Sequence, residues 1–181
     1  MDAKLCIQTR RSVRKFQDKP IDRALIREVI ALAQMAPTWR NSQTVRYWCI
    51  DDPALKAQIA QSGTLGFAKN ADNIKNAPVL MVVTSVNGIC GYNADGSFSS
   101  ALGRHWESFD AGLGVQTLCL ALHEAGLGSV IMGLFDPEIV ARLAGIPENQ
   151  SVACILAVGY PADGDHGNPA RKPLDEVLTF R

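Results

Sequence analysis

The stretch Pro78–Val86 constrains the fold most, because it is a nearly unbroken run of apolar residues. A strand without polar alternation is covered by protein on both faces. The run therefore predicts a central strand of a sheet that lies between helices. A chain of 181 residues, of which 47% are apolar and 20% charged, is long enough to build one such core. The sequence thus predicts a single domain over residues 1–181.

Further elements follow from apolar spacing and from residues that start or stop helices. The helix that begins after Asp22 has apolar residues at helical spacing and ends at Ala36, before Pro37. Strands are also predicted at 45–50, 129–135 and 152–159, and helices at 22–36, 53–61, 101–125 and 137–144, with a polar loop over 87–100. The predicted class is α+β, with a four-stranded core sheet between helices.

The predicted helix over 101–125 has no polar stripe between Ala111 and Leu122. A helix that is apolar all round is buried on more than one side. In a chain this short, a second subunit is the natural source of the additional cover. The sequence therefore predicts a homodimer.

The charges balance over the whole chain but not along it. The total of 18 Lys/Arg and 18 Asp/Glu argues against a general nucleic-acid coat or a polybasic membrane binder. Residues 1–46, however, hold ten Lys/Arg and only four acidic residues. This surplus predicts that the N-terminal region binds an anion.

The five cysteines lie far apart and include no Cys-x-x-Cys pair, so neither a disulfide framework nor a metal finger is predicted. Cys119 and His123 are spaced as i and i+4, but two ligands without a third favour core packing over a metal site. The N-terminus lacks an apolar signal core, and no stretch of 18 apolar residues occurs. We therefore expect a cytoplasmic protein without a membrane anchor.

Three segments offer groups that suit a flat anionic ligand. Residues 10–16 hold four cations and Ser12, which suit a phosphate, although a solvated charged face has the same composition. Residues 36–43 offer Thr, Asn, Ser and Gln side chains, which suit a polar heteroaromatic ring or simply cap a turn. Residues 126–133 hold three glycines, which permit close backbone approach but do not form the dinucleotide-binding Gly-x-Gly-x-x-Gly motif.

Together these segments resemble the FMN-dependent nitroreductase family, especially its short members. The resemblance covers nearly the whole chain and rests on the order and spacing of its motifs. They are Arg-Arg-Ser-x-Arg at 10–14, Ala-Pro-Thr-x-x-Asn-x-Gln at 36–43, Asn-Ala-Pro at 76–78, Asp-Ala-Gly at 110–112, Gly-Leu-Gly at 126–128, Gly-Tyr-Pro at 159–161 and Arg-Lys-Pro-Leu-Asp-Glu-Val at 171–177.

The resemblance implies a nitroreductase-like three-layer α/β/α fold with a central, mostly antiparallel sheet, in a homodimer with flavin sites between subunits. It assigns Arg10, Arg11 and Ser12 to the FMN phosphate and ribityl chain, and Arg14 to the ring near N1 and the C2 carbonyl. The other implied cofactor residues are Pro37, Thr38 and Asn41 from the opposite subunit, Val130, Ile131, Met132 and Gly133 beside the ring near N5, and Arg171 and Lys172 at the phosphate. Asn70 aligns only loosely with a ring-contacting asparagine and stays outside this set.

The implied activity is an FMN-dependent NAD(P)H oxidoreductase that passes hydride through flavin N5 to a nitroaromatic, quinone or similar acceptor by a ping-pong mechanism. No catalytic side chain is predicted, because the flavin carries the chemistry. The alternative is a non-catalytic flavin-binding or redox-sensing protein of the same fold. A third reading is a dehalogenating or substrate-desaturating branch of the family.

Two departures from the family pattern bear on the substrate. Gln43-Thr44-Val45 stands where the family commonly has Gln-Pro-Trp. The chain also lacks the long insertion that covers the site in larger members. Residues 61–76 and 87–104 are therefore the segments predicted to face the substrate.

Overall fold

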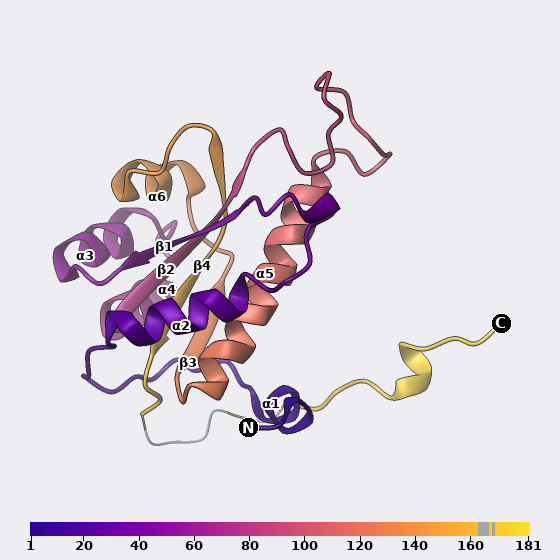
Figure 1. The fold of residues 1–181 in the computed structure, drawn as a ribbon. Coiled ribbons are helices and arrows are strands. Elements are labelled where there is room, and N and C mark those ends of the chain that lie inside the picture. The colour runs from indigo at the N-terminus through magenta and orange to yellow at the C-terminus, as the bar shows by residue number, and fades with distance from the viewer. Residues whose placement is uncertain (163–166, 168) are drawn as a thin grey trace.

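A four-stranded antiparallel sheet forms the centre of the protein (Figure 1). The structure is a computed structural model that describes residues 1–162, 167 and 169–181. The strands lie in the order β1 (Val45–Ile50), β2 (Val79–Val86), β4 (Gln150–Gly159) and β3 (Gly128–Met132), and every neighbouring pair is antiparallel. The predicted α+β class and four-stranded sheet are confirmed.

Strand β2 has the central position that its apolar sequence predicts. Its residues alternate between two separate clusters: Met81 and Val83 belong to one, and Leu80 and Val82 to the other. Seven of its eight residues are buried. A strand with apolar side chains on both faces needs a helical cover on both faces, and it has one.

One face of the sheet is covered by α2 (Arg23–Ala33) and α5 (His105–Glu124), with the short α1 (Ala3–Thr9) beside α5. Asp22 caps α2 by accepting a hydrogen bond from the backbone of Ala24 at 2.8 Å. Helix α2 ends at Ala33, before the predicted residue 36, because the chain already forms tighter turns there ahead of Pro37.

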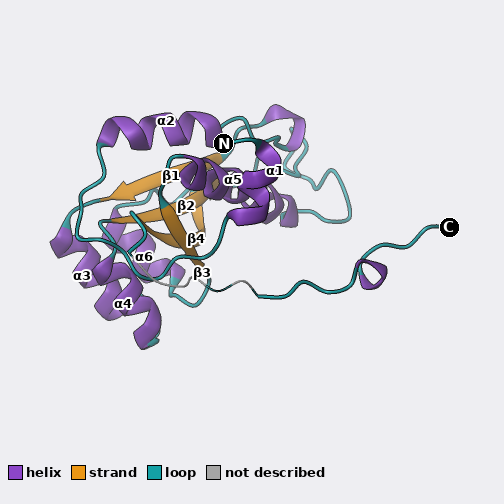
Figure 2. Cartoon of the chain, turned by 90° about the horizontal axis from the view of Figure 1, so that it is seen from below, coloured by secondary structure: helices purple, strands orange, loops and turns teal. Residues whose placement is uncertain are grey.

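The other face is covered by α3 (Pro53–Ser62), α4 (Ala68–Asn76) and α6 (Pro137–Ala144) (Figure 2). Helix α6 has its predicted bounds, with Asp136 as N-cap and Gly145 in the left-handed region at its C-cap. Strand β3 ends at Met132, short of the predicted residue 135, because the chain turns there and buries Phe135 in the second cluster. Helix α5 begins at His105, four residues later than predicted.

The two edges of the sheet differ. On the β3 edge, residues 10–16 run alongside, and the backbone N–H of Val13 donates to the carbonyl of Ser129 at 2.9 Å. Strand β1 forms the other edge, and no strand of the described residues pairs with its outer side.

The C-terminal segment extends away from the rest of the chain (Figure 1). It contains one short helix, η2 (Leu174–Glu176), and its apolar residues Leu174, Val177 and Phe180 are exposed, Phe180 to 88%. Among the described residues, no helix is both long and apolar enough to cross a membrane.

Candidate functional site

A groove of about 630 Å³ runs beside the edge strand β3. Its walls come from three parts of the chain that are distant in sequence. They are Arg14, the helix α4 with the preceding Phe67, and the strand residues Val130, Ile131 and Met132. Four residues of the predicted site, Arg14 and Val130–Met132, are thus brought together in one groove.

The strand wall presents free backbone groups. Ser129 directs its carbonyl outward to Val13, and the outward backbone groups of an antiparallel edge strand recur every second residue. Ile131 therefore also directs its N–H and C=O away from β4. Its side chain is 49% exposed, whereas Val130 and Met132 are buried. This edge offers one donor and one acceptor to a flat ligand.

Two asparagines of α4 form the opposite wall, and they were not in the predicted set. Asn70 and Asn73 are both buried. The amide of Asn70 donates to the Leu134 carbonyl at 2.9 Å, and that of Asn73 points to the Met132 sulfur at 3.9 Å. Both bonds use the amide nitrogen, and among the described residues no hydrogen bond reaches either side-chain oxygen. The loose alignment of Asn70 was the only sequence signal for this wall.

The remaining N-terminal site residues lie where α1 meets the C-terminal end of α5. Arg11 donates to the carbonyls of Gln8 and Arg10 at 2.7 and 2.8 Å, so part of its guanidinium serves the end of α1. The backbone of Ser12 forms an isolated parallel β-bridge with that of Ser129 at the start of β3. Burial, together with the positive charges of Arg10 and Arg11, lowers the pKa of His123. Arg10, Arg11 and His123 therefore form one positively biased corner.

Cys119 and His123, whose i, i+4 spacing would also suit a metal, have other contacts. The Cys119 sulfur is 3.6 Å from the Ser129 hydroxyl, and His123 Nε2 is 2.8 Å from the hydroxyl of Thr9. Within the part of the chain that the structure describes, no group of three metal-ligating side chains occurs.

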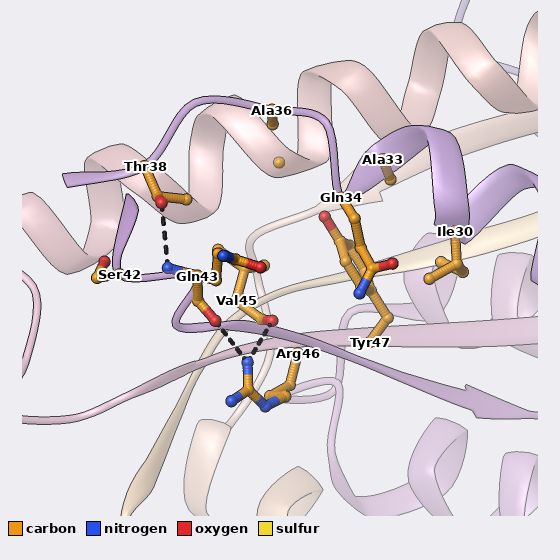
Figure 3. Close-up of a pocket in the computed structure, with 11 residues that line it drawn as sticks. Ile30, Ala33, Gln34, Ala36, Thr38, Ser42, Gln43, Val45, Arg46 and Tyr47 are labelled. Carbon is orange, nitrogen blue, oxygen red and sulfur yellow. Dashed lines mark hydrogen bonds between the residues drawn. The ribbon is translucent and has the colours of Figure 1, made fainter. Parts of the chain in front are cut away.

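The turn over residues 36–43 lines a second cavity of about 530 Å³, between α2, β1 and Gly114 of α5 (Figure 3). Thr38 shapes this turn by accepting a hydrogen bond from the Gln43 backbone at 3.1 Å. Residues 39–41 form the short helix η1 (Trp39–Asn41), and Asn41 is exposed. Pro37, Thr38 and Asn41 are therefore close to one another.

The two halves of the predicted site are far apart within one chain. The backbone N–H of Trp39 is hydrogen-bonded to Asp110 near the start of α5. The hydroxyl of Thr9 is hydrogen-bonded to His123 near the end of the same helix. Thirteen residues of α-helix span about 20 Å. The turn that carries Thr38 and Asn41 therefore does not approach the segment that carries Arg10 and Ser12.

The C-terminal cations also lie away from the groove. Arg171 donates to the Pro169 carbonyl at 3.2 Å, and Lys172 pairs with Glu176 at 3.2 Å. All four of these residues are exposed. The predicted contribution of Arg171 and Lys172 to a phosphate site is not assembled within the single chain.

Comparison with known proteins identifies relatives along the whole chain. A family model described as the nitroreductase family matches residues 7–160. An NADH dehydrogenase of Thermus thermophilus is 29% identical over 205 residues, which cover 100% of this chain and 97% of the relative. A nitroreductase family protein of Streptococcus pneumoniae superposes with a TM-score of 0.84 at 21% identity, covering 99% of this chain and 100% of that one.

A third relative has a ligand in its structure. It is an oxidized iodotyrosine deiodinase bound to FMN and 3-iodo-L-tyrosine. The superposition has a TM-score of 0.76 at 25% identity and covers 97% of this chain and 98% of that one.

Proposed function

Because the chain belongs to the nitroreductase family, we propose that it is an FMN-dependent NAD(P)H oxidoreductase. In this proposal residues 1–181 form a single FMN-binding domain that acts in a homodimer. Bound FMN supplies the redox chemistry, taking a hydride from NAD(P)H and passing reducing equivalents to a nitroaromatic, quinone or similar acceptor in a ping-pong cycle.

The groove beside β3 carries the proposal. A flavin ring needs a flat slot with hydrogen-bonding groups around its polar edge and a cation near N1. The groove offers the outward backbone of Ile131, the amides of Asn70 and Asn73, and the guanidinium of Arg14. Arg14 has no hydrogen bond or ion pair with any described residue, so it is free to meet a ligand. The residues present therefore fit the group.

In the proposed site each segment has a separate task. Arg10, Arg11 and Ser12 bind the phosphate and the ribityl chain. Their positive charges and the serine hydroxyl suit these two groups. Arg14 holds the ring near N1 and the C2 carbonyl. Val130–Gly133 position the ring edge near N5 and leave one ring face open. Arg171 and Lys172 add positive charge at the phosphate.

A second copy of the chain completes this site. Thr38 and Asn41 lie about 20 Å along α5 from the phosphate corner, so only the turn of another subunit can bring them to the flavin. Helix α5 also keeps an exposed stripe that includes Phe109, Gly112 and Gln116. The extended C-terminal segment, with its exposed apolar residues, adds further surface for a partner subunit. We propose that both contribute to the dimer, whose subunits have a three-layer α/β/α arrangement.

Two measurements test the proposed function. The purified protein should show the visible spectrum of a flavin and release FMN, not FAD, on denaturation, because its cations suit one terminal phosphate. It should then oxidise NADH or NADPH faster when a quinone or nitroaromatic acceptor is added. Protein that cannot be reconstituted with FMN would contradict the cofactor assignment. Flavin-loaded protein that never oxidises NAD(P)H would favour the non-catalytic alternative.

The dimer is tested by sedimentation of the flavin-loaded protein. We expect the mass of two chains. A well-behaved monomer with full flavin content would contradict the inter-subunit site.

A further inference from the structure

Asp110 is a buried carboxylate without a cation partner in the described residues. It lies on α5 and is 1% exposed. One oxygen, Oδ2, accepts a hydrogen bond from the backbone N–H of Trp39 at 2.8 Å and from the thiol of Cys90 at 3.0 Å. Burying a carboxylate is costly unless its hydrogen bonds are strong and well placed. These two contacts are therefore the features that keep it in the interior.

The first contact holds a turn that is strained. Arg40, Asn41 and Gln43 all have positive φ angles, of 46°, 55° and 48°. Residues with a Cβ adopt this region at a cost of about 1–2 kcal/mol each. Such a turn persists only where its surroundings fix it. The Trp39 N–H bond to Asp110 lies directly beside these residues and ties the turn to α5.

The second contact holds the loop over residues 87–104. Cys90 is fully buried, and burial together with the hydrogen bond to Asp110 raises its thiol pKa to about 12. The thiol therefore stays protonated and donates to the carboxylate. Nearby, the rings of Trp39 and Trp106 lie 4.6 Å apart, and the indole N–H of Trp106, in the first turn of α5, donates to the Ser100 hydroxyl of the loop at 2.7 Å. Asp110 thus connects two segments that belong to different parts of the sequence.

We propose that Asp110 is a positioning residue, which fixes the turn carrying Thr38 and Asn41 so that it completes the flavin site of the second copy of this chain. The inference rests on the proposed function and adds a residue that touches neither flavin nor substrate. In this arrangement the two residues act on different sites of the dimer. Asp110 supports the site of the partner subunit, whereas Arg10 supports the site of its own chain.

The first test compares Asp110→Asn with Glu107→Gln in the flavin-loaded dimer. Asparagine keeps the size and one acceptor oxygen but loses the charge, so the hydrogen bonds from Trp39 and Cys90 become weaker neutral ones. Glu107 lies on the same helix and accepts a backbone hydrogen bond from Gly88 at 2.7 Å, and no hydrogen bond among the described residues joins its side chain to the turn. We expect Asp110→Asn to bind FMN at least tenfold more weakly at an unchanged fold, and Glu107→Gln to bind it like wild type. Equal FMN affinity in all three proteins would overturn the proposal.

The decisive test uses mixed dimers of Arg10→Ala and Asp110→Asn chains, co-expressed with different affinity tags and purified through both. One site of each mixed dimer combines the intact Arg10 segment of one chain with the intact turn of the other, so we expect one tight FMN site and about half of the wild-type turnover per dimer. Both parent homodimers lack such a site. If Asp110 acted only within its own chain, no site would be intact. FMN affinity no better than that of the parents would then overturn the proposal.

Other outcomes separate this inference from the proposed function. If wild type binds FMN as a dimer but oxidises no NAD(P)H, the FMN titration of mixed dimers still decides the role of Asp110. If Asp110→Asn does not fold, Cys90→Ala takes its place, because it removes one of the two donors and keeps the carboxylate. We expect a smaller loss of FMN affinity that mixed dimers with Arg10→Ala also restore. Unchanged affinity in a folded Cys90→Ala dimer would overturn the proposal.

Discussion

Val13 occupies the space that a side chain at position 128 would need. A Cβ on Gly128 would lie 2.6 Å from Cγ2 of Val13, closer than real Cβ contacts allow. The same valine donates its backbone N–H to Ser129 at 2.9 Å. The glycine therefore lets residues 10–16 lie directly against β3, which is the arrangement that places Arg14 in the groove.

Gly128→Ala should force these segments apart. We expect a loss of about 1–3 kcal/mol in the free energy of unfolding, the usual cost of overpacking, together with weaker FMN binding. Urea denaturation and an FMN titration measure the two effects. Val13→Gly provides the control, because it removes the Cβ of residue 13, which would lie 2.7 Å from the new Cβ, together with both γ-carbons. In that background the added methyl group should cost clearly less, and equal costs in both backgrounds would refute the steric explanation.

Arg10→Ala should weaken FMN binding while the fold survives. A charge-assisted hydrogen bond contributes about 1.5–3 kcal/mol, which corresponds to about a 10- to 150-fold higher Kd. Arg142→Ala is the matched control, because Arg142 is an exposed arginine on α6, away from the phosphate corner. If the two variants bind FMN equally well, the phosphate contact belongs to other residues.

Raising the pH above 9 should destabilise the protein through Cys90 and Cys154, two thiols whose pKa is raised. Burial raises the thiol pKa of Cys90 and Cys154 to about 12 from the ordinary 9.0, with Asp110 adding to the shift at Cys90 and Cys119 at Cys154. Between these values the unfolded chain loses the protons that the folded chain keeps. Each such thiol therefore lowers the free energy of unfolding by about 1.4 kcal/mol per pH unit. Below pH 9 the thiol is protonated in both the folded and the unfolded chain, so none of this stability is lost.

Urea denaturation at pH 8 and pH 10 measures the effect. Lys56, whose pKa is lowered by burial, acts in the opposite direction, so the informative quantity is the change of slope in a variant. Cys154→Ala should reduce the loss between the two pH values. Val83→Ala, a core substitution that removes no thiol, should lower stability equally at both. If the two variants show the same pH dependence as wild type, the thiols are not responsible.

The sequence predicted the sheet well, because its strands are short apolar runs with clear turn residues at their ends. The predicted bounds of β1 are those observed, and β2 differs by one residue. Helix α4 was not predicted, because two of its three buried residues are Asn70 and Asn73. Apolar periodicity cannot detect a helix that buries amides, and these amides form one wall of the groove.

The candidate site was only partly predictable for a different reason. A motif shows which residue types are present, but not whether they meet in one chain or across two. Arg14 and Val130–Met132 meet in one groove, while Thr38 and Asn41 lie at the other end of α5. Sequence spacing carries no information on this distance, which depends on how α1 and the turn at Trp39 dock onto the helix.

The last prediction concerns Arg14 and separates redox chemistry from binding. A guanidinium beside N1 and the C2 carbonyl stabilises the anionic reduced flavin more than the oxidised flavin, so it raises the midpoint potential. Arg14→Gln keeps a hydrogen-bond donor and removes the charge. Taking about 1.5–3 kcal/mol as the upper range for a charged hydrogen bond, and about 1.4 kcal/mol per 30 mV for a two-electron couple, the midpoint should fall by up to about 30–65 mV. The exposure of Arg14 makes solvent and salt reduce this shift.

A redox titration of wild type, Arg14→Gln and Arg142→Gln at matched flavin occupancy measures the shift of the midpoint potential. Arg142→Gln should leave the midpoint unchanged, because removing a distant surface charge affects both flavin states equally. The Arg14 shift should also shrink as ionic strength rises, since the arginine side of the groove is open to solvent. An unchanged or raised midpoint in Arg14→Gln at low salt would remove Arg14 from the flavin ring. The groove would then keep its asparagine and β3 walls but lose its cation.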